Sequence, residues 1–160
     1  MSALSQERDD SVPSFNTIVL VEGISDRIAV EALAERRHRN LAAEELDVRR
    51  GLERAGFSHD LTRADMERLG FFVCIADLED ELIRALGAAS VETVLEAHGD
   101  LRSFRTLQKQ PAWRGRSTEQ QLRRFMGSGG SRKMRYARLL VEALEPANVP
   151  RPLDRLLSRL

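Results

Sequence analysis

Two carboxylates stand where a buried strand is expected to give way to a helix. The segment "TIVLVEGISDRIAVEALAERRHRN" (17–40) places Glu22 directly after an apolar run and Asp26 four residues later, with Gly23 permitting a tight turn between them. Open α/β sheets bind their ligands at the carboxyl ends of parallel strands, so the two side chains can converge on one point. Ligand sets made only of oxygen atoms favour hard cations such as Mg²⁺ or Mn²⁺. Such an ion neutralises the charge that develops during phosphoryl transfer.

Each of these carboxylates also has a purely structural explanation. A negative charge in the first turn of a helix, as at Asp26, is stabilised by the helix dipole. Glu22 can be a solvated loop residue. The residues alone leave both explanations open.

A second acidic group follows the second apolar run. "GFFVCIA" (70–76) is succeeded by Asp77, Glu79 and Asp80. Asp77 and Glu79 could complete a metal site begun by Glu22 and Asp26. They could equally stabilise the start of the helix expected over 77–86, and the two roles are compatible.

The elements that must position these acids are two strands and a series of helices. Continuous apolar runs predict buried strands at 17–21 and 70–76. Helical periodicity and capping residues predict helices over 25–38, 47–55, 62–70, 77–86, 90–97, 101–108, 118–126 and 131–144, with a short one at the C-terminus. This order predicts an α/β protein with a helical C-terminal part. The expected organisation is a flexible tail at 1–15, an α/β core at 16–87 and a basic helical region at 88–160 packed on it.

Composition narrows the class of protein. Of the 160 residues, 42% are hydrophobic, enough for a folded core, and Cys74 is the single cysteine. Its apolar neighbours indicate an inert, buried thiol. No stretch approaches the roughly 20 apolar residues of a membrane span, and the N-terminal residues lack the apolar segment of a signal peptide. These features predict a cytoplasmic protein without a membrane partner.

The net charge of zero conceals two oppositely charged halves. Residues 1–100 carry a net charge of −10, and residues 101–160 carry +10. The basic half suggests a polyanion partner, DNA or RNA, although the two halves could instead pair with each other. Arginine beside an aromatic ring suits backbone contact with base stacking. The predicted nucleic-acid-binding residues are Lys109, Trp113, Arg114, Arg116, Arg123, Arg124, Arg132, Lys133 and Arg135.

The motif "VLVEGISDRIAVEALAERR" resembles the first motif of Toprim domains. The segments "FFVCIADLEDELIRALG", "SFRTLQKQPAWRGRSTEQQLRRFMG" and "RKMRYARLLVEAL" resemble small bacterial Toprim proteins described as OLD-like ATP-dependent endonucleases. The resemblance implies a shortened Toprim, Rossmann-like parallel sheet. It also implies a metal-dependent nuclease in which Glu22 is a metal ligand or general acid/base and Asp26 supports a second Mg²⁺ or Mn²⁺.

The chain departs from the Toprim pattern in one respect. Toprim domains carry an Asp-x-Asp motif at the end of a later strand, and this sequence contains none; only "LAAEELDV" (41–48) stands where several tens of residues are expected. Asp77-x-Glu79 has the same spacing and is the expected substitute. The alternative is a catalytically impaired relative that binds nucleic acid or acts as an interaction module. "GSGG" (127–130) lacks a P-loop lysine, so ATP hydrolysis would require a separate ATPase partner.

Overall fold

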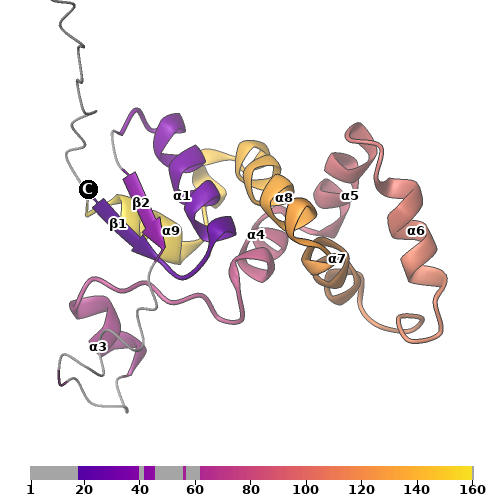
Figure 1. Cartoon of the computed structure of the whole chain (residues 1–160), viewed down its shortest axis with the longest axis horizontal. Coiled ribbons are helices and arrows are strands. Elements are labelled where there is room, and N and C mark those ends of the chain that lie inside the picture. Colours follow the sequence, from indigo (N-terminus) through magenta and orange to yellow (C-terminus); the bar gives the residue numbers. More distant parts are fainter. Residues whose placement is uncertain (1–17, 40–41, 46–55, 57–61, 160) are drawn as a thin grey trace, which may run out of the picture.

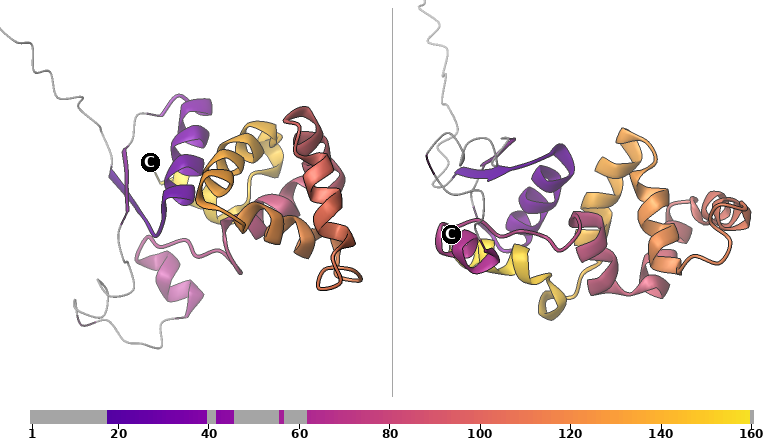
Figure 2. Two further views of the ribbon diagram at one scale, coloured as in Figure 1. Left: turned by 45° about the vertical axis from the view of Figure 1, so that its right-hand side comes forward. Right: turned by 90° about the horizontal axis from the view of Figure 1, so that it is seen from below.

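Helices dominate the part of the chain that the computed structural model describes, residues 18–39, 42–45, 56 and 62–159 (Figure 1). The elements in chain order are β1 (Ile18–Val21), α1 (Ile24–Arg36), β2 (Ala42–Glu45), α3 (Arg63–Arg68), α4 (Leu78–Leu86), α5 (Ala88–Ala97), α6 (Leu101–Lys109), α7 (Thr118–Gly127), α8 (Gly130–Ala143), a 3₁₀ turn (Pro146–Asn148) and α9 (Arg151–Leu157). The strands, α3 and α9 lie at one end of the molecule, and α5 and α6 lie at the other (Figures 1 and 2).

The two strands form a short parallel pair. Ile18 is opposite Ala42 and Val21 is opposite Glu45, with α1 as the crossover between the strands. The strand β1 was predicted and is confirmed. The strand β2 was not predicted, because Ala-Ala-Glu-Glu has low strand propensity. Pairing with β1 makes this segment a strand.

The predicted shortened Toprim, Rossmann-like parallel sheet is wrong. Residues 70–76, the expected second core strand, pair with no strand among the described residues, and β1 with β2 is the one sheet found there. The backbone N–H of Phe71 instead donates to the carbonyl of Met66, and that of Ile75 donates to Glu81 Oε1 at 2.7 Å. Val73 and Ile75 of this run are exposed, so its continuous hydrophobicity ensured neither burial nor strand pairing.

The core is built by helix packing. Helix α8 packs along α1, and α4 packs on both α7 and α8 (Figure 1). The helix predicted over 131–144 is confirmed, and it buries Tyr136, Ala137, Leu140 and Val141 in this core. Helices from both predicted segments, 16–87 and 88–160, thus contribute to the same hydrophobic core.

The capping residues act as the sequence predicted. Thr62 and Asp65 form a reciprocal capping box at the start of α3. The Asp77 side chain accepts a hydrogen bond from the backbone N–H of Asp80 and begins α4, which ends at Gly87 with φ +77°. The helix predicted over 47–55 lies outside the described residues.

No helix in the described ranges is both long and apolar enough to cross a membrane.

Candidate functional site

The four predicted metal-binding carboxylates line one cavity of about 410 Å³, here called the carboxylate cavity. Glu22 follows β1, and Asp26 lies in the first turn of α1. Asp77 and Glu79 lie at the start of α4. Lys133, from the first turns of α8, is the fifth charged residue in the lining. The four carboxylates therefore share a cavity, which is formed by helix packing and not by adjacent strands of a sheet.

Burial governs the chemistry of two of these acids. Glu79 is only 4% exposed and Asp26 is half-buried. Loss of hydration raises the pKa of Asp26, and the neighbouring charges of Glu22 and Asp77 raise it further, while Lys133 opposes them. Burial likewise raises the pKa of Glu79, again against the opposing charge of Lys133. A nearby cation would stabilise the ionised forms of both carboxylates.

One oxygen in the cavity lacks a hydrogen-bond partner. Within the described residues, Glu79 Oε1 is buried and accepts no hydrogen bond. The ammonium of Lys133 lies 3.6 Å from it, which is an ion pair but too long for a hydrogen bond. A buried acceptor left in this condition is unusual and often marks a position where a ligand binds.

Asp77 is fully engaged by the protein. Its Oδ1 accepts a hydrogen bond from the backbone N–H of Asp80 at 2.9 Å, and its Oδ2 accepts one from Arg123 Nε at 2.7 Å. Arg123 Nη2 also forms an ion pair with Oδ2 at 2.6 Å. The structural role proposed for Asp77 from the sequence, helix capping, is therefore confirmed. Its carboxylate also anchors α4 to α7.

The carboxylate cavity meets part of what a hard cation needs. Among the residues that the structure places, no three His, Cys, Asp or Glu side chains are gathered closely enough to hold a metal ion. The donor chemistry nevertheless suits Mg²⁺ or Mn²⁺, because Glu22, Asp26 and Glu79 offer oxygen atoms and Glu79 Oε1 has no hydrogen-bond partner. The residues that could hold the ion are thus Glu22, Asp26 and Glu79, and Asp77 could join them only by leaving Arg123.

Cys74 also lines the carboxylate cavity. Burial, with the charges of Glu81, Asp26, Asp77 and Glu79, raises the pKa of the Cys74 thiol to about 12. The thiol therefore stays protonated at neutral pH and is a poor nucleophile. This agrees with the inert cysteine that the sequence predicted.

A second cavity, of about 660 Å³, lies on the other side of Asp77 and is here called the tryptophan cavity. The loop between α6 and α7 contributes Trp113 and Arg116, and α7 contributes Arg123 and Arg124. The Arg124 guanidinium carbon lies 5.9 Å from the centroid of the Trp113 ring, a cation–π distance. Asp77 lines both cavities, so the two adjoin.

Gln121 fixes the loop that carries Trp113. This side chain is buried, and its Nε2 donates to the carbonyl of Trp113 at 2.8 Å and to that of Arg116 at 3.1 Å. Its Oε1 accepts from Gln108 Nε2 at 2.7 Å. Sequence reasoning missed Gln121, because a glutamine in a polar helix gives no sign that it will be buried.

The nine predicted nucleic-acid-binding residues divide into groups. Lys109 and Arg114 are exposed and line neither cavity. Arg132 stacks on Phe125 at 4.3 Å and donates to Ser128. The remaining member outside both cavities, Arg135, pairs with Asp100. The other five line a cavity: Trp113, Arg116, Arg123 and Arg124 line the tryptophan cavity, and Lys133 lines the carboxylate cavity. The role of all nine in binding nucleic acid stays a prediction.

Tyr136 belongs to the core. It is 1% exposed, and its hydroxyl donates to Asp100 Oδ2 at 2.7 Å. Burial and this carboxylate raise the pKa of Tyr136 well above its usual value. Tyr136 therefore contributes to core packing and not to an exposed binding surface.

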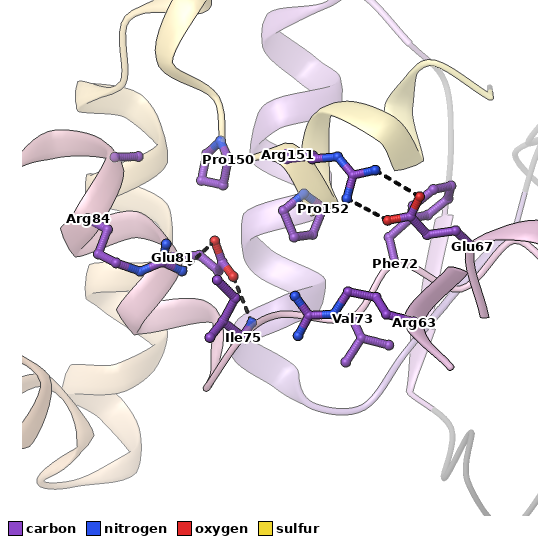
Figure 3. A pocket seen from close by; sticks show the side chains of 11 residues that line it. Arg63, Glu67, Phe72, Val73, Ile75, Glu81, Arg84, Pro150, Arg151 and Pro152 are labelled. Atoms are coloured by element: carbon purple, nitrogen blue, oxygen red, sulfur yellow. Dashed lines mark hydrogen bonds and ion pairs between the residues drawn. The ribbon is translucent and has the colours of Figure 1, made fainter. Parts of the chain in front are cut away.

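A third cavity, of about 310 Å³, lies beside the extended segment 71–76 (Figure 3). Two of its arginines are held by ion pairs, Arg151 with Glu67 and Arg84 with Glu81. Val73 and Ile75 present exposed apolar side chains there. None of the predicted site residues lines this cavity.

The chain was compared with protein-family models, curated proteins and solved structures, and no match was found in any of the three. The resemblance of its first motif to Toprim domains stays a prediction.

Proposed function

We propose that this protein binds nucleic acid and hydrolyses its phosphodiester bonds with the help of Mg²⁺ or Mn²⁺. One observation carries the proposal: Asp26 and Glu79, which are far apart in the sequence, line one cavity with Lys133, and that cavity adjoins one lined by Trp113 and arginines. Carboxylates for a cation beside guanidinium groups for phosphates are what phosphodiester hydrolysis needs.

The residues of the carboxylate cavity have distinct roles in this proposal. Glu22, Asp26 and Glu79 hold the cation, which when bound polarises the phosphate and makes water a better nucleophile. Lys133, within the same lining, donates to a phosphate oxygen and orients the scissile group. Asp77 keeps α4 and α7 together through Arg123.

The raised pKa values of Asp26 and Glu79 bear on how the cation is bound. Desolvation and the other acids disfavour their ionised forms. A bound divalent cation favours the ionised forms, so binding releases protons and tightens as the pH rises. Cleavage should therefore increase with pH over the range in which these carboxyls ionise.

The test is cleavage of labelled DNA and RNA with Mg²⁺, with Mn²⁺ and with a chelator. Glu79→Gln and Glu22→Gln should each lower the rate by at least about 100-fold, since even indirect supporters of a metal site cost about 10–100-fold. Glu96→Gln, an exposed change on α5, is the matched control and should leave the rate unchanged. Cleavage that survives both the chelator and Glu79→Gln would refute the proposal.

A specific observation favours a second candidate, a binding module without turnover. Within the described residues no three potential ligands form a metal site, and Asp77 is committed to Arg123. This candidate predicts salt-dependent binding of nucleic acid, with no cleavage under any metal condition and no effect of Glu79→Gln on affinity. We also predict that the protein has a separate ATPase partner and a cytoplasmic location.

A further inference from the structure

We infer that the tryptophan cavity is a subsite for an unpaired nucleotide, so that the substrate is single-stranded nucleic acid. The inference rests on the proposed function for the identity of the polymer, and goes beyond it by naming the form that is bound. It depends on the ring of Trp113, on the charges around it, and on the position of the cavity relative to the carboxylates.

The Trp113 ring is presented for stacking. Trp113 is the single tryptophan of the chain, is half-buried, and lines the wall of the cavity. Gln121 holds its backbone from within, which keeps the loop in place without occupying the cavity. A base can stack on such a ring only when it is free of its pairing partner and neighbours, as in a single strand.

The charges around the ring suit a phosphodiester backbone. The cavity is lined by three arginines, Arg116, Arg123 and Arg124, and by three carboxylates, Asp77, Asp80 and Glu119. Asp77 is paired with Arg123 and Asp80 with Arg84, which leaves Arg116 and Arg124 facing Glu119. Of the arginines in the cavity, Arg123 has an ion-pair partner in the described structure, and no carboxylate partner is seen there for Arg116 or Arg124. Guanidinium groups bind phosphate oxygens in bidentate fashion, so two of them beside a stacking ring fit one nucleotide.

The position of the cavity links binding to the proposed chemistry. Asp77 lines both cavities, and Arg123, its partner, lines the tryptophan cavity. A nucleotide whose base rests on Trp113 would therefore place a neighbouring phosphate next to the carboxylates. The volume of about 660 Å³ lies in the range of small-molecule sites.

The experiment uses the intrinsic fluorescence of Trp113, which reports this site alone. The full chain, in chelator to prevent cleavage, is titrated with a short oligothymidylate, with an oligouridylate, and with a blunt duplex of the same length. Both single strands should quench the fluorescence at saturation, and the duplex should not. Equal quenching by the duplex, or binding of the single strands without quenching, would overturn the inference.

Variants give a second measurement, the anisotropy of a labelled oligothymidylate. Trp113→Ala should weaken binding by about 5- to 150-fold, the range for loss of one stacked base, while Trp113→Phe should keep most of the affinity. Arg102→Ala, an exposed change on α6 outside the cavity, is the control. Circular dichroism spectra exclude misfolding, and wild-type affinity in folded Trp113→Ala would contradict the inference.

The outcomes separate this inference from the proposed function. Quenching by single strands without any metal-dependent cleavage would refute the nuclease activity and support the nucleotide subsite. Cleavage of duplex and single strand at equal rates, without quenching, would support the nuclease activity and refute the nucleotide subsite. Failure of every oligonucleotide to bind refutes both.

Discussion

The carboxylate cavity and the tryptophan cavity adjoin at Asp77, yet they are built in opposite ways. The first draws its charges from β1, α1, α4 and α8, which are spread over most of the chain. The second takes eight of its ten lining residues from one stretch, 112–127, with Asp77 and Asp80 from α4. One cavity depends on the whole fold, and the other depends mainly on one loop and one helix.

The difference extends to how the charges are held. In the carboxylate cavity Glu79 is buried, and desolvation raises the pKa of both Glu79 and Asp26. In the tryptophan cavity Arg116 and Arg124 are exposed and keep their hydration. Buried like charges strain the fold until a counter-charge binds, whereas exposed charges respond mainly to ionic strength. The two sites should therefore react differently to metal, salt and pH.

The largest expected effect is stabilisation of the fold by a divalent cation. At a concentration about 100 times the dissociation constant, Mn²⁺ should add about 2.7 kcal/mol to the free energy of unfolding. For a chain of this size that raises Tm by about 5–10 °C. Asp26→Asn combined with Glu79→Gln should abolish the shift, and Arg116→Ala should keep it. Equal shifts in all three proteins, measured by calorimetry, would show that the carboxylate cavity is not the metal site.

The next effect concerns the salt dependence of nucleic-acid binding. Each phosphate contact on a single strand contributes about 0.7 to the slope of log affinity against log salt concentration. Arg116→Ala combined with Arg124→Ala should lower the magnitude of this slope by about 1.4 for an oligothymidylate. The Mn²⁺-induced change in Tm should stay as in wild type. An unchanged slope would place the phosphate contacts elsewhere.

A smaller effect, with opposite signs in the two cavities, is expected for Arg123→Gln. The variant frees Asp77 Oδ2 and removes a cation from the tryptophan cavity. Exposed ion pairs contribute about 0.2–1 kcal/mol, so metal affinity should rise, and oligonucleotide affinity should fall, by about 1.5- to 5-fold. Arg138→Gln, which breaks exposed pairs with Glu35 and Glu142 and lies outside both cavities, is the control. Calorimetric titration that finds both affinities moving in the same direction would contradict the role of Asp77 as the link.

The smallest effect is on the pH dependence of stability without metal. The folded-state pKa of Asp26 lies above its ordinary value of 3.8, so its ionisation destabilises the fold. Asp26→Asn should therefore match wild type below about pH 3.8 and become the more stable protein as pH rises through the raised pKa. Denaturant unfolding at a series of pH values measures this.

Asp65 provides the control of opposite sign. Its hydrogen bonds with Thr62 lower its pKa, so its ionised form stabilises the fold. Asp65→Asn should be less stable than wild type at neutral pH, and the difference should vanish as the pH falls through the lowered pKa. If both variants showed the same pH dependence, burial would not be what distinguishes Asp26.

Much of the local structure could be predicted because local interactions determine it. The capping side chains of Thr62 and Asp77 bond within three residues of themselves, and the apolar stripe of α8 repeats with the helical period. The candidate site residues were also visible, since a carboxylate at the start of a helix and a tryptophan among arginines stand out by type. The sequence by itself thus determined the helices and the strand β1, and it identified most of the charged and aromatic residues that line the two cavities.

Only the tertiary structure decided which of these residues meet. It made β2 a strand by pairing it with β1, and left 70–76 outside any ladder in the described part of the chain. It moved Lys133 from the expected phosphate-binding surface into the carboxylate cavity, and joined Arg123 to Asp77. These contacts link segments far apart in the chain. They depend on how α1, α4, α7 and α8 pack, and the periodicity of each helix specifies its buried face but not its neighbour.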